Sequence, residues 1–369
     1  MVTVKLKNQW VQKMQNFKYF TDYESDKSIK IAISALVGKL SPKPSSHKSG
    51  WAFMLCNQLV NAGYKNATVI TDWTTDWSQF DVVLLEHGME YKGTFNIFGG
   101  ANDELFHQIN RLFTKGPRMY SLHHDMPSIA ELIEKRLKTG TELFQTLEAR
   151  IEEAREICSG IQRVDHIEKT NKLCFGDSHS FSQYSPGFMV NRNDGLTLFG
   201  TLKRGLVDYV YPWTSELRIY LGNIDIRHHL MRQADPKSAL TKMIEQYEQT
   251  LQESGIKTIE VVQALPIENE SRQLPKTGYY KDTPFAGSWQ ERTDLVKLMN
   301  EMIVDMCTRN GWSTWKHSDV YKNPIGELSF DVMEKPKSVH IAREFYRWDL
   351  VNNEPNKKLE VVQIQTALF

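Results

Sequence analysis

The sequence predicts an α/β protein made of two three-layer domains, each with a mainly parallel sheet. The chain has 369 residues, the length of about two ordinary domains. Short segments rich in β-branched and apolar residues alternate with longer amphipathic segments in both halves. Because strands that alternate with helices pair in parallel, each half is expected to have a Rossmann-like or flavodoxin-like arrangement.

The first half, residues 1–165, is expected to form one domain that binds a substrate or a partner. Its strands are predicted at residues 30–36, 67–71, 80–85 and 118–122, and its helices at residues 50–62, 103–113 and 128–160. Ser128 and Glu131 have the spacing of a capping box at the start of the last helix. We place the domain boundary after that helix, where no Pro- or Gly-rich linker marks it.

The second half, residues 166–369, repeats the alternation and is expected to form the second domain. Its strands are predicted at residues 173–175, 216–221, 259–265 and 359–365, and its long helices at residues 236–255 and 289–310. Gly255 and Gly311 stand where these two helices are expected to stop, as is typical of glycine at a helix C-terminus.

The composition excludes wholesale disorder and gives no sign of a nucleic-acid partner. Hydrophobic residues make up 40% of the chain and aromatic residues 11%, enough to build two cores. Lys plus Arg and Asp plus Glu both number 45, so the protein has no global basic field. A local basic patch stays open as an alternative.

The sequence contains no signal for a membrane, an export pathway or a cofactor. No apolar run approaches the ~20 residues of a membrane span, and residues 1–16 lack the apolar stretch of a signal peptide. The four cysteines form no Cys-x-x-Cys pair, which argues against a zinc ribbon and a disulfide framework. We therefore expect a reduced, cytoplasmic protein with no membrane partner, metal or cofactor.

Residues 173–180, Leu-Cys-Phe-Gly-Asp-Ser-His-Ser, place a serine directly after a predicted strand. A serine on a tight turn at the carboxyl edge of an α/β sheet stands free of the backbone, where it can act as a nucleophile. Three further segments follow in order. They are Gly200 and Gly205 on either side of Thr-Leu-Lys-Arg, residues 221–227 (Leu-Gly-Asn-Ile-Asp-Ile-Arg), and residues 338–341 (Ser-Val-His-Ile).

These four segments resemble, in order, the sequence blocks of the SGNH (GDSL-type) hydrolases over about residues 170–350. The resemblance implies an SGNH-hydrolase-like second domain in which Ser178 is the nucleophile and His340 is the general base. It assigns the oxyanion hole to Gly200 or Gly205 together with Asn223. Residues 221–227 are closer to the Gly-Glu-Ile-Asp-x-Arg variant of the third block.

Two positions depart from the family pattern. The family usually has Asp three residues before the histidine, where this chain has Lys337. We assign the acid to Asp331, with Glu334 or a serine–histidine dyad as alternatives. Ile224 stands at the position of the family's oxyanion asparagine, so Asn223 is one residue early and faces the other way if the segment is a strand.

The resemblance implies acyl transfer, either to water in an esterase or to a hydroxyl group in an O-acyltransferase. His340 would take the proton of Ser178 from ~3 Å away. We expect a glycan- or nucleotide-linked substrate bound by residues of both halves: Asp177, His179, Asp225, Arg227, His228, Lys39, His47 and Lys48. Asp177 is also expected to fix the turn. The non-enzymatic alternative is an SGNH-like binding module that has lost its acid. Ser178 would then be an ordinary turn residue.

Residues 176–179 and 222–225 are also similar to metallophosphoesterase blocks. With His228, His229 and His340 they form a conceivable two-metal site. The upstream Asp-x-His and the late Gly-His-x-His of such enzymes are missing, and adjacent histidines point in different directions on a regular element. We therefore predict no metal.

The first half of the chain contains a loop that points to an alternative function. The loop of residues 38–50, rich in Ser and Lys, precedes a predicted helix and suits a phosphate group, although it lacks the P-loop pattern and otherwise serves as a solvated cap. Together with residues 120–125 it resembles the first lobe of two-lobed glycosyltransferases, including those of phages that glucosylate DNA. The resemblance implies an alternative function, a glycosyltransferase that modifies a glycan or nucleic acid. Trp73, Trp77 and Tyr91 are expected either to stack a sugar or base or to belong to the core.

Overall fold

The structure, a computed structural model, divides into two compact units. The first unit ends at Lys169 and the second begins at Thr170. The structure describes residues 17–34, 47–70, 75–85, 116–122, 160–268, 280, 283–317, 319–334, 338–346, 348–349 and 354–355. The predicted helices at residues 103–113 and 128–160 and the predicted strand at residues 359–365 lie outside these residues.

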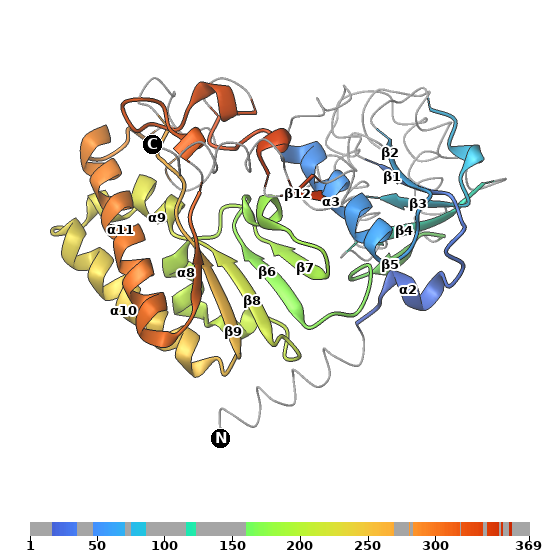
Figure 1. The fold of residues 1–369 in the computed structure, drawn as a ribbon, viewed down its shortest axis with the longest axis horizontal. Coiled ribbons are helices and arrows are strands. Elements are labelled where there is room, and N and C mark those ends of the chain that lie inside the picture. The colour runs from blue at the N-terminus through green and yellow to red at the C-terminus, as the bar shows by residue number, and fades with distance from the viewer. Residues whose placement is uncertain are drawn as a thin grey trace, which may run out of the picture. The chain divides into compact units, whose positions relative to one another are not determined.

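The first unit contains a five-stranded sheet in which all neighbouring strands are parallel (Figure 1). Its strands are β1 (Ile31–Ser34), β2 (Ala67–Ile70), β3 (Val82–Leu85), β4 (Arg118–Leu122) and β5 (Gln162–Val164), in the order β2-β1-β3-β4-β5. All four residues of the central strand β3 are buried, as expected for a parallel strand covered on both faces. The described helices of this unit are α2 (Phe20–Tyr23) and α3 (His47–Asn61), with a 3₁₀ turn at Trp77–Gln79.

The second unit contains another five-stranded parallel sheet (Figure 1). Its strands are β6 (Lys172–Gly176), β7 (Phe188–Arg192), β8 (Glu216–Tyr220), β9 (Thr258–Val262) and β10 (Ser313–Trp315), in the order β10-β9-β8-β6-β7. Its helices are α8 (Leu198–Arg204), α9 (Asn223–His228), α10 (Pro236–Glu253) and α11 (Trp289–Asn310). Short 3₁₀ turns include η2 (Ser180–Gln183) and η6 (Phe330–Val332), and β11 (Trp348–Asp349) pairs with β12 (Glu354–Pro355).

Both sheets have the same strand order. When the strands of each sheet are counted along the chain, the order is 2-1-3-4-5, which is that of flavodoxin-like folds. Ligands in such sheets bind at the carboxyl ends of the strands, where the order switches between the first and third strand. The predicted α/β fold with parallel sheets is confirmed, and in the second unit the switch point lies between β6 and β8.

The two long helices of the second unit begin and end where their caps require. The Asp235 side chain accepts hydrogen bonds from two backbone N–H groups at the start of α10, whose first residue is Pro236. Ser288 and Glu291 form a capping box at the start of α11, and Gly311 ends that helix at a φ of 66°. None of the described helices combines the length and the apolar character that crossing a membrane requires.

Candidate active site

The turn after β6 carries Ser178 to the carboxyl edge of the second sheet. β6 ends at Gly176, where a Cβ atom would lie 2.1 Å from the Tyr220 carbonyl oxygen of β8, so only glycine lets the two strands approach. The Asp177 N–H donates to the same carbonyl at 3.3 Å, and the Ser180 N–H donates to the Asp177 carbonyl at 3.1 Å. Ser178 is half-buried on this turn, next to the topological switch point.

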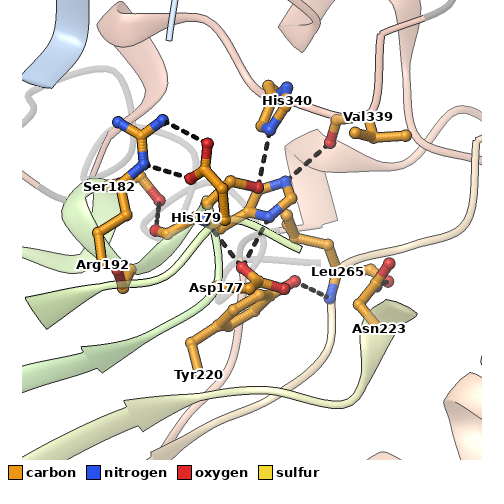
Figure 2. Close-up of polar contacts among 12 residues, drawn as sticks. Asp177, His179, Ser182, Arg192, Tyr220, Asn223, Leu265, Val339 and His340 are labelled. Carbon is orange, nitrogen blue, oxygen red and sulfur yellow. Dashed lines mark hydrogen bonds and ion pairs between the residues drawn. The ribbon is translucent and has the colours of Figure 1, made fainter. Parts of the chain in front are cut away.

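The structure brings the predicted nucleophile and base together. His340 Nε2 lies 2.9 Å from Ser178 Oγ, although the two residues are 162 positions apart in sequence (Figure 2). The exposed fraction of the His340 side chain is 18%, which leaves this pair reachable from solvent. At this distance the imidazole can take the hydroxyl proton directly.

Glu334 provides the carboxylate on the other side of the imidazole. Its Oε1 atom lies 3.6 Å from His340 Nδ1, within ion-pair range but longer than a hydrogen bond, and its side chain is 3% exposed. The Ser338 hydroxyl donates to Glu334 Oε1 at 2.8 Å and accepts from the His340 N–H at 3.1 Å. The Glu334 N–H donates to the His340 carbonyl at 3.1 Å, so three residues hold one another in place.

Asp331, the predicted acid, does not take this place. Its side chain is exposed on the short turn η6, and its backbone N–H donates to the Ser329 hydroxyl at 3.3 Å. The structure places Glu334 against His340 instead, which corrects the assignment. Lys337 lies outside the described residues.

The two glycines expected in the oxyanion hole are used inside helix α8. The Gly200 N–H donates to the capping Thr197 hydroxyl at 2.9 Å, and the Gly205 N–H donates to the Thr201 carbonyl at 2.8 Å. The prediction that one of them donates to an oxyanion is therefore wrong, because both N–H groups already have acceptors at the ends of the capped helix α8.

The contacts of two other candidate oxyanion donors show whether each is free to donate a hydrogen bond to a substrate. The buried Asn223 amide donates to the Leu265 carbonyl at 2.9 Å, so it would have to leave this partner to reach a substrate. Within the turn from Asp177 to Ser180, the N–H of Ser178 itself has no acceptor among the described residues, whereas the other three N–H groups are bonded. The Ser178 N–H is therefore the donor available beside the hydroxyl.

Comparisons with known proteins leave the family open. Neither a scan against protein-family models nor a search of curated proteins finds a match. A solved structure described as a "putative platelet activating factor" from Streptococcus pneumoniae is 13% identical, with a TM-score of 0.37, and the match covers 52% of this chain and 85% of that one. A GDSL-like lipase from Bacteroides thetaiotaomicron is 16% identical, with a TM-score of 0.36 and coverage of 53% and 89%.

A third similar structure, a gut microbial diltiazem-metabolizing enzyme, is 15% identical, with a TM-score of 0.28, and the match covers 41% of this chain and 37% of that one. Similarity this low does not assign the chain to a family.

Several predicted substrate-binding residues are engaged inside the fold. Asp225 is buried on α9 and accepts hydrogen bonds from the N–H groups of Leu198 at 2.7 Å and Phe199 at 3.1 Å, where α8 begins. Burial raises the pKa of Asp225 to about 6, and these two hydrogen bonds oppose the rise. Arg227 forms a buried ion pair with Glu268 at 2.9 Å. Both side chains are buried and held by partners within the fold, so the structure does not support their predicted role in substrate binding.

Of four more predicted substrate-binding residues, the structure describes the side chain of one, His228. The half-buried His228 ring stacks on Phe285, with ring centroids 5.3 Å apart. Lys39 lies outside the described residues, and His47 and Lys48 begin α3 with side chains that are not described. Trp77 is buried in the first unit, in keeping with a core role, whereas Trp73 and Tyr91 lie outside the described residues.

Asp177 and His179 are also buried, with exposed fractions of 0% and 3%. Their side chains contact each other and the His340 segment rather than solvent (Figure 2), so the structure corrects the prediction that they bind substrate directly. Within the described part of the chain, no three His, Cys, Asp or Glu side chains gather as a metal site would require.

Proposed function

We propose that this protein is a serine-dependent acyl hydrolase or acyltransferase with Ser178 as nucleophile, His340 as general base and Glu334 as the acid that orients the base. One observation carries the proposal: His340 Nε2 lies 2.9 Å from Ser178 Oγ at the carboxyl edge of a parallel sheet. The buried Glu334 carboxylate on the Nδ1 side supports it, because a triad needs a group that holds the imidazole and stabilises its protonated form.

The reaction would proceed in two steps, acylation of Ser178 and then deacylation. Ser178 Oγ attacks the carbonyl carbon of an ester while its proton passes to His340 Nε2. The resulting tetrahedral intermediate collapses, the alcohol leaves with the proton from His340, and the acyl group stays on Ser178 as an ester. Water or an acceptor hydroxyl then attacks this acyl-enzyme, again with His340 as base, and Ser178 recovers its proton.

Stabilisation of the tetrahedral oxyanion would begin at the Ser178 N–H. This donor points from the same turn as the nucleophile and has no competing acceptor among the described residues. One such donor is worth about 2.7–4 kcal/mol of transition-state stabilisation in comparable sites. Burial of the neighbouring turn strengthens such a hydrogen bond by excluding water.

The geometry favours an enzyme over an inactive binding module. The module interpretation depended on the missing acid three residues before His340, and Glu334 now supplies a carboxylate from another direction. For the substrate, we propose an ester of a glycan or of a nucleotide-linked sugar, based on the Ser- and Lys-rich segment of residues 38–50 in the first unit. Acetylated sugars should then be hydrolysed with a lower KM than simple aryl acetates.

Hydrolysis of p-nitrophenyl acetate by the wild type and by Ser178→Ala tests the proposal. We expect the variant to lose at least about 100-fold in kcat/KM, because the nucleophile is absent while the fold is unchanged. Matching thermal unfolding curves would show that the variant is folded. Equal turnover by the two proteins would remove Ser178 from the mechanism.

A further inference from the structure

We infer that His179 is a positioning residue that couples the turn carrying Ser178 to the segment carrying His340. The inference rests on the proposed function and concerns how the pair is held at reacting distance. His179 Nδ1 lies 3.1 Å from Asp177 Oδ1, and His179 Nε2 lies 2.9 Å from the carbonyl oxygen of Val339 (Figure 2). One imidazole therefore joins the residue before the nucleophile to the residue before the base.

The ring of His179 also limits how the ring of His340 can turn. The centroids of the two imidazoles are 4.8 Å apart, and their planes meet at 32°. On its other side the His179 ring packs against Tyr220 of β8, with centroids 5.4 Å apart. His340 thus rests on a ring that the sheet itself holds in place, and rotation away from Ser178 would have to displace it.

Asp177 holds both the backbone and the ring of His179 in place. Its Oδ1 atom accepts the His179 backbone N–H at 2.9 Å as well as facing Nδ1, so the backbone and the ring of His179 are held by one oxygen. Asp177 and Val339 both offer acceptor oxygens, so the imidazole donates to one of them, or to both when it is doubly protonated. Either way the ring acts as a rigid spacer between two backbone segments.

The burial of His179 indicates that it positions the base and does not bind substrate. With 3% of its surface exposed, the side chain does not reach a ligand in front of Ser178. Its loss should therefore lower kcat and leave KM for a small ester unchanged. A displacement of the base by about 1 Å is enough to cost about 100-fold in rate.

Three substitutions each keep a different subset of the contacts that His179 makes. His179→Gln keeps an amide that reaches toward Val339, and His179→Asn keeps one that reaches only toward Asp177. His179→Phe keeps a ring against His340 and Tyr220 but neither polar contact.

His317→Phe is the matched control. It removes another buried imidazole, 5% exposed, which packs on Tyr220. It should leave kcat within about twofold of the wild type, because no contact to either reacting residue is lost.

The experiment measures kcat and KM for p-nitrophenyl acetate and the rate at which a fluorophosphonate modifies Ser178, at temperatures well below unfolding of each variant. We expect His179→Phe and His179→Asn to lose about 10- to 100-fold in kcat and in modification rate at unchanged KM. His179→Gln should recover most of that loss.

Three results would overturn the inference. If the Asn and Phe variants turn over like the wild type, His179 does not position the base, although the proposed function stands. If the wild type itself neither hydrolyses the ester nor reacts with the fluorophosphonate, both the function and the positioning role fall. A loss without recovery in His179→Gln, accompanied by a raised KM, would also contradict a role through Val339.

Discussion

The buried carboxylate of Glu334 is expected to contribute most to the reaction when His340 takes up a proton. In the resting arrangement Glu334 Oε1 is 3.6 Å from His340 Nδ1 and accepts a hydrogen bond from Ser338. A proton on the imidazole would turn this contact into an ion pair. Because the Glu334 side chain is only 3% exposed, water would screen that pair weakly. Catalytic hydrogen bonds are often long in the free enzyme and shorten when the reaction charges them.

Glu334→Gln should therefore lower kcat for p-nitrophenyl acetate by about 100-fold or more, because the uncharged amide cannot stabilise the imidazolium. Asp331→Asn is the matched control, since it changes the same chemical group on the exposed turn η6. Its kcat should stay within about twofold of the wild type. The reverse ranking of the two variants would restore Asp331 as the acid.

Motif order was enough to predict that Ser178 and His340 lie together, but not which carboxylate faces His340. Ser178 and His340 each sit in a recognisable segment, whereas Glu334 reaches the imidazole only because the Ser338 hydroxyl and the backbone hydrogen bond between Glu334 and His340 fold these residues onto each other. Such closure depends on the path of the chain, which spacing alone does not give. His179 was identified in the motif, but its burial and its bond to Val339 required the fold.

At the level of elements, α8 depends on a carboxylate from another helix. Asp225 of α9 accepts two of the orphan N–H groups at the start of α8, and its negative charge also faces the positive end of that helix. Burial nevertheless raises the pKa of Asp225 from its usual 3.8 to about 6. The folded state therefore binds a proton on Asp225 more tightly than the unfolded state does.

This shift sets the sign of a pH effect on stability. Because the folded pKa lies above the unfolded one, the contribution of protonated Asp225 is complete below about pH 4 and is lost as the pH rises through about 6. A shift of about two units corresponds to about 3 kcal/mol. Asp225→Asn removes the titrating group while one side-chain oxygen still accepts from α8.

Urea unfolding of the wild type and Asp225→Asn at pH 4, 5, 6 and 7 measures this contribution. The variant should gain stability relative to the wild type as the pH rises, by about 3 kcal/mol over the range. Differences in unfolding free energy that stay constant with pH would contradict a raised pKa at this position.

Long helices were easier to predict than short strands. The bounds of α11, Trp289–Asn310, match the prediction, since its capping box and terminal Gly311 are local signals. β5, β7 and β10 were missed. Two of them have three residues, and β7 ends in Asn191 and Arg192, so their periodicity is too short or too mixed to stand out. The helix α9 was not predicted; it begins directly after β8, where Gly222 turns the chain at a φ of 105°.

At the scale of the whole molecule, the strand order explains why distant residues meet. In the second unit β6 and β8 flank the topological switch, so the turn after β6 opens at the edge where ligands bind in such sheets. The segment of residues 338–346 returns to this edge after β10 and brings His340 to Ser178. The first unit repeats the strand order, but the loop that follows its first strand lies outside the described residues, so its part in binding stays a proposal.

The most direct test of the central claim is to treat the wild-type protein with a fluorophosphonate and to locate the adduct by peptide mass spectrometry. A hydroxyl primed by an imidazole at 2.9 Å should react, and other serines should not. We predict one phosphonylated peptide, containing Ser178, and no adduct after His340→Ala. An unmodified Ser178, or equal labelling of the His340→Ala variant, would contradict the account.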